Sequence, residues 1–274
     1  MTISDPDEFI QKLKNREPES FALLYAAYGS KVYGMAYRMT GNQADAEDIT
    51  QETFLQVYRK VEDFRGQSQL YTWIYAIAKN LCYRYFQRAK KSSFAIFEDL
   101  IYSQAEVEPS ELAAWEKQKL IRQVKEGCLT GLVRCLAFQQ RMAFILHVLL
   151  QLPIQDVAEI LDKSDAATKV LLHRARKNLK RFLCKNCSVY DPANPCHCGD
   201  LLGFSLQQGW IKRPSSGEKN FPEAQQIEGE IKRIREVVEL YAQLPTPQPA
   251  QDLNHRIRQL IFEQEGAIFT RKKV

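Results

Sequence analysis

The stretch that decides the fold is PIQDVAEILDKSDAATKVLLHRARKNLKRFL, at residues 153–183. Apolar residues recur three and four positions apart on both sides of the polar turn DKSD, which predicts a short helix followed by a longer one. Ser164 or Asp165 can cap the second helix. That helix, from Ala166 to Leu183, carries six Lys or Arg side chains and no acid. This pattern is typical of a helix-turn-helix that places a cationic helix in the DNA major groove, although an ordinary helix pair with a solvated basic face has the same appearance.

The rest of the chain has the same helical character. Its 274 residues are enough for two compact domains or three small ones. The chain is 45% apolar and has a net charge of +5. Alternation with a period of two is scarce, so the sequence predicts an all-α fold. No apolar run approaches the roughly 20 residues needed to cross a bilayer, and the N-terminus lacks a signal-peptide pattern. We therefore expect a cytoplasmic protein without a membrane partner.

Changes in composition divide the chain into segments. Two helical blocks are separated by a mixed, acidic stretch that contains Pro109 and reads as a linker. A Cys-rich segment follows the second block. The remainder is an extension with helices expected at 222–244 and 252–265, joined by the stiff sequence PTPQP. The predicted organisation is a first block at 5–91, a linker at 92–110, a second block at 111–183, a Cys-rich segment at 184–200 and an extension at 201–274.

The first block contains an acidic helix that starts ADAEDITQETF at residues 44–54. Acids in a first helical turn complement the helix dipole, so part of this charge has a structural explanation. A dense acidic face can also dock a basic partner surface.

A loop and a third helix follow, and they mix aromatic residues with cations. Unpaired bases stack on aromatic rings and their phosphates need neutralising, so this mixture suits single-stranded DNA. Phe64 and Arg65 lie in a loop beside Gly66 and are the better candidates for contact. Trp73 is more readily explained as a core residue.

These motifs together resemble the sigma-70 family of bacterial RNA polymerase subunits, in its small extracytoplasmic-function (ECF) group. Residues 44–54 look like the polymerase-binding helix of sigma region 2, and FRGQS at 64–68 followed by TWIY at 72–75 resembles the adjoining segment that reads the minus-ten element. LHRAR at 172–176 resembles the end of the region 4 recognition helix. The resemblance covers about residues 5 to 183 and implies two helical domains, regions 2 and 4.

The resemblance implies roles for particular residues. The acidic helix would bind the clamp helices of the polymerase β′ subunit through Asp45, Asp48, Gln51, Glu52 and Phe54. The minus-ten element would be bound by Phe64, Arg65, Tyr71, Asn80, Arg84 and Arg88. The minus-thirty-five element would be bound by Thr168, Lys169, His173, Arg174, Arg176 and Lys177. Region 4 would also meet the β flap, promoter DNA would be the second partner, and an anti-sigma factor would be a possible third.

The chain departs from the family at the recognition helix. Family members usually carry Thr-Val-Lys-Ser-Arg before Leu-x-Arg-Ala-Arg, whereas here ATKVL occupies residues 167–171. The missing Ser and Arg would have faced DNA, and Leu171 could pack on another element instead. The sequence therefore predicts weak or unusual minus-thirty-five recognition.

Four cysteines gather after the basic helix, as Cys-x2-Cys followed by Cys-x-Cys. Four thiolates at this spacing suit a closed tetrahedral zinc site, so we expect structural Zn2+ bound by Cys184, Cys187, Cys196 and Cys198. His197 could replace one of them. Thiols that sense oxidation and a segment that senses metal are alternatives. Cys82, Cys128 and Cys135 have no spacing pattern and are expected in the core.

An enzyme and a stand-alone DNA-binding regulator are the two other functional classes that a helical chain of this kind could represent. An enzyme is disfavoured, because the sequence has no phosphate-binding glycine loop, zinc-protease motif or nucleophile elbow. A helix-turn-helix regulator that acts without polymerase would need neither the acidic helix nor the aromatic-cationic loop. The extension at 201–274 could dock on either block and hold the protein inactive, or it could bind a regulator.

Overall fold

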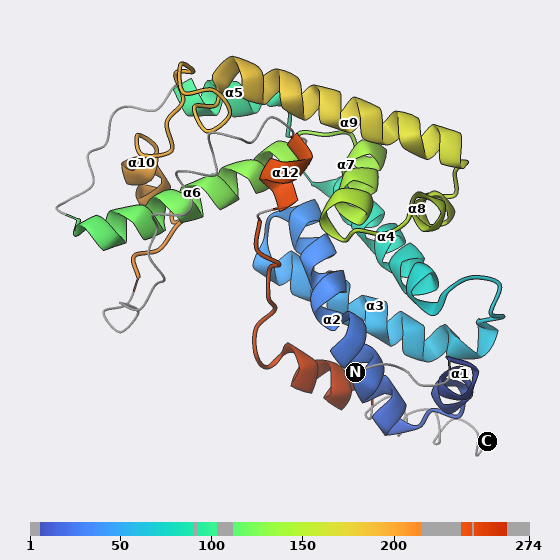
Figure 1. Ribbon diagram of the computed structural model, residues 1–274. Helices are drawn as coiled ribbons and strands as arrows, with labels where there is room; N and C mark the ends of the chain where they lie inside the picture. Colours follow the sequence, from blue (N-terminus) through green and yellow to red (C-terminus); the bar gives the residue numbers. More distant parts are fainter. Residues whose placement is uncertain (1–5, 90–91, 103–111, 215–236, 243, 262–274) are drawn as a thin grey trace. The chain divides into compact units, whose positions relative to one another are not determined.

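The computed structural model describes residues 6–89, 92–102, 112–214, 237–242 and 244–261 (Figure 1). Within these ranges the chain consists of helices and connecting segments, apart from one isolated bridge between Cys187 and Cys196. The prediction of an all-α fold is confirmed. The chain divides into two compact units, one from the described parts of 1–90, 145–169 and 245–274 and one from those of 91–144 and 170–244.

The first unit is a bundle of helices whose ends follow from local sequence. Pro18 lies in the first turn of its longest helix, and Gly41 ends that helix with a left-handed φ of 70°. The Asn42 side chain then accepts a hydrogen bond from the Asp45 backbone N–H, which caps the next helix. The elements are α1 (Pro6–Lys14), α2 (Pro18–Thr40), α3 (Gln43–Lys60), η1 (Val61–Asp63), α4 (Leu70–Arg88), the π-helix η2 (Ile145–Leu149), α8 (Ile154–Leu161) and a helix at 253–261.

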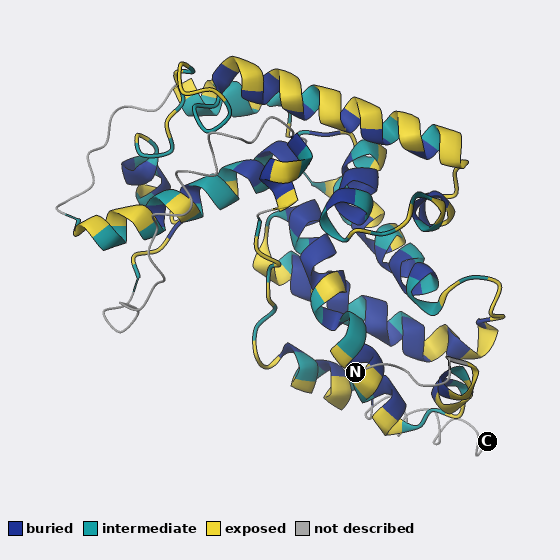
Figure 2. Cartoon of the chain, in the orientation of Figure 1, coloured by how far each residue is buried: buried dark blue, intermediate teal, exposed yellow. Residues whose placement is uncertain are grey.

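Aromatic side chains form the centre of this bundle. The helices α2, α3 and α4 pack against one another. Between α2 and α3, Phe21 meets Tyr58 edge to face at 4.9 Å and Tyr25 meets Phe54 at 5.0 Å. Buried residues line the facing sides of these helices (Figure 2). These aromatic pairs fix α3, with its acidic outer side, on a rigid base.

The helix-turn-helix predicted from the opening stretch is present. The first helix, α8, ends at Asp162, which adopts a left-handed φ of 55°. The second helix, α9 (Asp165–Asn186), begins where the Ser164 hydroxyl accepts a hydrogen bond from the Ala167 N–H. Among the described helices none is long and apolar enough to cross a membrane.

The second unit contains the remaining helices. Phe94 and Phe97 of α5 both contact Phe182 of α9, at ring distances of 5.8 Å, so part of the predicted linker 92–110 is a packed helix. Of the helix predicted at 222–244, residues 222–236 lie outside the described part, and 237–242 are helical. The elements are α5 (Phe94–Tyr102), α6 (Ala114–Arg134), α7 (Phe138–Phe144), α9 from Val170 onward, α10 (Leu202–Gln207) and α12 (Val237–Ala242).

An apolar cluster and a hydrogen bond hold the extension within this unit. Leu202 of α10 and Ile211 pack on Leu120 and Val124 of α6. The fully buried Tyr241 of α12 donates its hydroxyl hydrogen to the Leu129 carbonyl at 3.0 Å. Parts of the extension therefore belong to the core of the second unit.

Candidate functional site

The acidic helix α3 presents a polar face beside the aromatic core. Asp48 is exposed, and Asp45, Gln51 and Glu52 are half-buried, so these four predicted polymerase-binding side chains lie at the surface. Phe54 is buried, at 2% exposure, against Tyr25. It supports the face from beneath, and direct contact with a partner would require its exposure.

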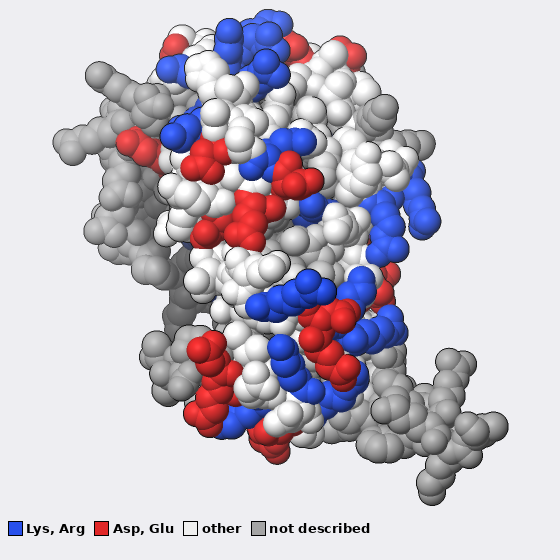
Figure 3. Space-filling view, turned by 90° about the vertical axis from the view of Figure 1, so that its right-hand side faces the viewer, with Lys and Arg blue, Asp and Glu red and all other residues white. Residues whose placement is uncertain are grey.

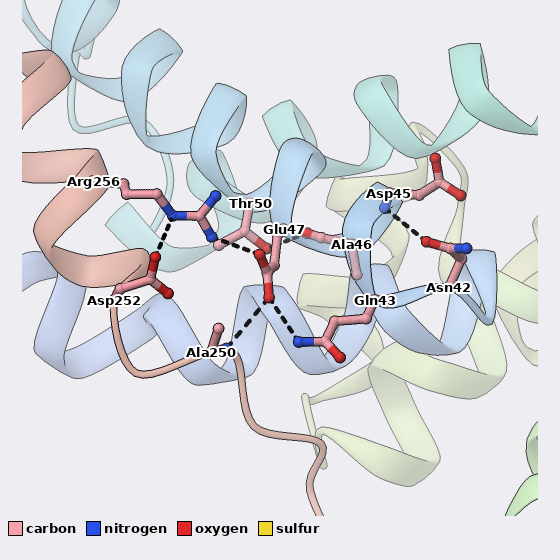
Figure 4. Close-up of polar contacts among 9 residues, drawn as sticks. All are labelled: Asn42, Gln43, Asp45, Ala46, Glu47, Thr50, Ala250, Asp252 and Arg256. Atoms are coloured by element: carbon pink, nitrogen blue, oxygen red, sulfur yellow. Dashed lines mark hydrogen bonds and ion pairs between the residues drawn. The ribbon is translucent and has the colours of Figure 1, made fainter. Parts of the chain in front are cut away.

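A fourth acid on α3, Glu47, is not among the site residues predicted from the sequence. Its carboxylate is almost buried and accepts hydrogen bonds from Gln43 at 3.0 Å, from the Ala250 N–H at 3.4 Å and from Arg256 at 2.5 Å (Figure 4). Burial opposes ionisation of this group, but these hydrogen bonds and the Arg256 charge outweigh it and lower the pKa of Glu47. Glu47 therefore joins the C-terminal segment to α3.

The loop after α3 and the helix α4 hold the residues predicted to bind the minus-ten element. Arg65 is exposed in the loop. Asn80, Arg84 and Arg88 are exposed on α4 at intervals of four residues, so they share one face of the helix. Phe64 is buried at 4% exposure and packs on the Trp73 ring at 5.3 Å, so stacking of Phe64 on a base would require it to leave this position.

Tyr71, also predicted to bind the minus-ten element, has a protein partner. Its hydroxyl donates a short hydrogen bond to the Asp156 carboxylate of α8, and α4 packs along α8. Burial, together with this hydrogen bond and the carboxylate charge, raises the pKa of Tyr71 to about 12. Contact between this hydroxyl and DNA would break the bond to Asp156.

The helix α9 carries an exposed cationic surface. Lys169, His173, Arg174, Arg176 and Lys177 are all exposed. Figure 3 shows how Lys and Arg side chains reach the surface of the chain, with Asp and Glu among them. Phosphate contacts need such long, exposed cations.

The apolar side of α9 holds one of the residues predicted to bind DNA. Thr168 is fully buried, so its hydroxyl is withdrawn from the exposed surface. Leu171, which replaces a polar residue of the family pattern, is half-buried.

The Cys-rich segment folds into a turn that backbone hydrogen bonds hold together. The Ser188 N–H donates to the Cys196 carbonyl at 3.1 Å, and the Cys196 N–H donates to the Asn186 carbonyl at 3.0 Å. Cys198 packs on the apolar cluster of α6 and α10. Burial raises the pKa of the Cys196 thiol to about 11 and that of Cys198 to about 12, in each case with Cys187 contributing.

The structure places two cysteines differently from the spacing argument. Cys184 is exposed on the last turn of α9. Cys128 of α6 has a raised pKa through burial, and the neighbouring thiols of Cys198, Cys187 and Cys196 add to the effect. Cys128 therefore lies near the cluster, which no sequence spacing indicated. Among the described residues, no group of three or more His, Cys, Asp or Glu side chains is arranged so that it could hold a metal ion.

Comparison with protein families identifies two matching segments. Residues 24–92 match the family model for sigma-70 region 2, which spans α2, α3 and α4. Residues 126–179 match the model for sigma-70 region 4, which includes α8 and most of α9.

Curated relatives match across the same part of the chain. The RNA polymerase sigma factor YlaC of Bacillus subtilis is 30% identical over 175 residues, which cover 64% of this chain and 96% of YlaC. The ECF RNA polymerase sigma factor SigM of B. subtilis is 31% identical over 157 residues, 57% of this chain and 91% of SigM. The ECF sigma factor BldN of Streptomyces coelicolor is 28% identical, and the match covers 64% of this chain and 65% of BldN.

Among solved structures, CnrH in complex with the cytosolic domain of CnrY aligns with a TM-score of 0.48 and 18% identity. The alignment covers 65% of this chain and 97% of CnrH. The family assignment depends on the sequence matches, which reach nearly the full length of several relatives and follow the helices described above. The chain belongs to the ECF group of the sigma-70 family of RNA polymerase sigma factors.

Proposed function

We propose that this chain directs RNA polymerase to promoters, with α3 docking on the core enzyme and α4 and α9 binding DNA. The core enzyme would supply all the catalysis, in the cytoplasm. The observation that carries the proposal is the arrangement of α3 and α4 in one rigid bundle, with acids exposed on α3 and Asn80, Arg84 and Arg88 in line on α4. The acidic surface of α3 suits a basic protein partner. The cationic face of α4 suits a melted DNA strand.

The same proposal assigns α9 to the minus-thirty-five element. Lys169, His173 and Lys177 are spaced by four residues and exposed, so they can follow one groove of duplex DNA. Thr168 is buried and Leu171 replaces a polar residue, which leaves few short polar groups for reading base edges. This helix would supply affinity through phosphates more than sequence selectivity.

Run-off transcription from a genomic promoter library tests the proposal. Purified core polymerase is assayed alone, with the full chain, with the double variant Arg84→Ala and Arg88→Ala, and with the control Lys117→Ala, an exposed residue of α6. We expect new start sites with the full chain and the control, and a loss of most initiation with the double variant. If no new start site appears and the chain does not bind core polymerase, the proposal fails, and the chain is better explained as a helix-turn-helix regulator that acts without polymerase.

For the Cys-rich segment we propose a structural zinc ion, with Cys128 taking the place predicted for Cys184. Cys128 is half-buried, and Cys187, Cys196 and Cys198 add to the rise in its pKa that burial causes, which supports this choice, whereas Cys184 is exposed. Zinc binding would require the thiols to lose their protons and draw closer together. Such an ion would tie the turn after α9 to α6.

The rival for this segment is a redox or metal sensor. Buried thiols with raised pKa values react slowly with oxidants, which favours a structural ion over an oxidation sensor. Zinc content of the purified chain, measured with and without a chelator, together with transcription under both conditions, separates the two. A structural ion predicts unfolding of this segment when zinc is removed, whereas a sensor predicts altered transcription by a folded chain.

A further inference from the structure

The C-terminal segment lies on the surface of α2 and α3. Arg38 of α2 donates a hydrogen bond to the Pro245 carbonyl at 2.9 Å, where the segment begins. The Ala250 N–H and the Arg256 guanidinium then bind the two oxygens of Glu47 on α3. Residues 245–261, named here the tail, are thus attached to both helices.

Apolar contacts continue the attachment along the tail. Leu253, Ile257 and Ile261 face inward at 0%, 1% and 8% exposure. Ile257 and Ile261 line a groove together with Phe21 of α2 and Phe54 of α3. Burial of three aliphatic side chains at this spacing gives the tail helix one continuous apolar face.

The tail meets the surface that α3 would offer to polymerase. Phe54, one of the residues predicted to bind the core enzyme, lines the groove under the tail. Asp48, another of them, contributes to the raised pKa of Arg256, after the hydrogen bond and charge of Glu47, so it lies within electrostatic range of the guanidinium. A cationic, apolar helix therefore already occupies the edge of this acidic face.

We propose that the tail and the core polymerase compete for α3, and that polymerase binds after the tail has left. This inference rests on the proposed function, because it takes α3 as the docking helix. In the free chain residues 245–261 cover this side of α2 and α3, and the incoming partner is a basic surface of the core enzyme. The apparent affinity of the chain for polymerase is then reduced by the fraction of molecules with a docked tail.

The test uses charge reversal in the full-length chain. Arg256→Glu places a carboxylate beside Glu47 and Asp48 and expels the tail, whereas Lys117→Glu makes a charge reversal of the same size at an exposed position of α6. Affinity for labelled core polymerase is measured by titration for both variants and the unaltered chain. We expect Arg256→Glu to bind roughly tenfold more tightly, and Lys117→Glu to bind like the unaltered chain.

The outcomes separate this inference from the proposed function. If no form binds core polymerase, the proposed function fails. If all forms bind equally well, or Arg256→Glu binds more weakly, α3 or another surface docks without competition from the tail and the inference is overturned.

A peptide experiment covers the case in which Arg256→Glu folds poorly. A synthetic peptide of residues 245–261, added in excess to the unaltered chain, is expected to weaken polymerase binding. The same peptide with the Arg256→Glu change serves as its control. Equal effects of the two peptides, or no effect of either, would count against competition at α3.

Discussion

Replacement of Glu47 by Gln tests whether one ionised carboxylate holds the tail on α3. Oxygen Oε1 accepts from Gln43 and Ala250, and Oε2 accepts from Arg256 at 2.5 Å. The amide oxygen of a glutamine can still accept from Gln43 and Ala250. Its NH2 group then faces the Arg256 guanidinium, and because both groups are donors, no hydrogen bond forms between them. The substitution therefore removes the charged bond and leaves a conflict in its place.

The size of the effect follows from the exposure of the pair. Hydrogen bonds to charged groups contribute about 1.5–3 kcal/mol. The Glu47 side chain is 12% exposed, but that of Arg256 is 41% exposed, and solvent screening reduces the contribution to about 1–2 kcal/mol. Tail docking should weaken roughly five- to thirtyfold.

Hydrogen exchange measures this change directly. The N–H groups of Leu253 and Arg256 are bonded within the tail, to the carbonyls of Ala250 and Asp252, and should exchange faster by the same factor in Glu47→Gln. Glu52→Gln is the matched control, since Glu52 lies on the same helix and bonds to Gln56. If tail exchange were unchanged in Glu47→Gln, or equally faster in both variants, the charged bond would not be what holds the tail.

Three further predictions follow. The pKa of Glu47 is lowered from its ordinary value of 4.5, so the tail should be fully protected from exchange above pH 4.5 and should lose this protection as the pH falls through the lower pKa of the folded chain. Hydrogen exchange of the tail, measured from pH 6 to 3, should show this loss in the unaltered chain and not in Glu47→Gln. Tyr241→Phe removes the hydroxyl hydrogen bond to the Leu129 carbonyl, which keeps its helical partner within α6. The change should destabilise the second unit by about 0.5–1.5 kcal/mol in urea unfolding, and an unchanged midpoint would contradict this. Cys128→Ser should lower the zinc content of the purified chain, measured by mass spectrometry, while Cys135→Ser should not, and equal zinc in both would remove Cys128 from the site.

Local sequence was sufficient to predict the recognition helix and its partner. The spacing of apolar residues from 153 to 183 marks one buried face on each helix, and Ser164 supplies the cap that separates them. The acidic helix α3 could be predicted equally well, because its charges and its Asn42 cap lie within one short stretch of sequence. Patterns of this kind report which side of a helix is buried.

Contacts between distant segments could not be predicted in the same way. Glu47 and Arg256 are separated by 209 positions, and neither stands out from the other charged residues in the sequence. Cys128 lacks any spacing relation to the later cysteines, because α6 brings it there through tertiary packing. Phe64 has the sequence pattern of a surface aromatic in a loop, but the ring of Trp73, which lies nearby and is half-buried, gives it a surface to pack on.

The long separation between Glu47 and Arg256 has a consequence for the newly made chain. Synthesis proceeds from the N-terminus at about 5–20 residues per second, so the 209 positions between these residues take roughly 10 to 40 seconds to translate. Throughout that interval α2 and α3 exist without the segment that later covers them. On the ribosome, the side of α2 and α3 beside Phe54 is therefore uncovered before any tail has been made.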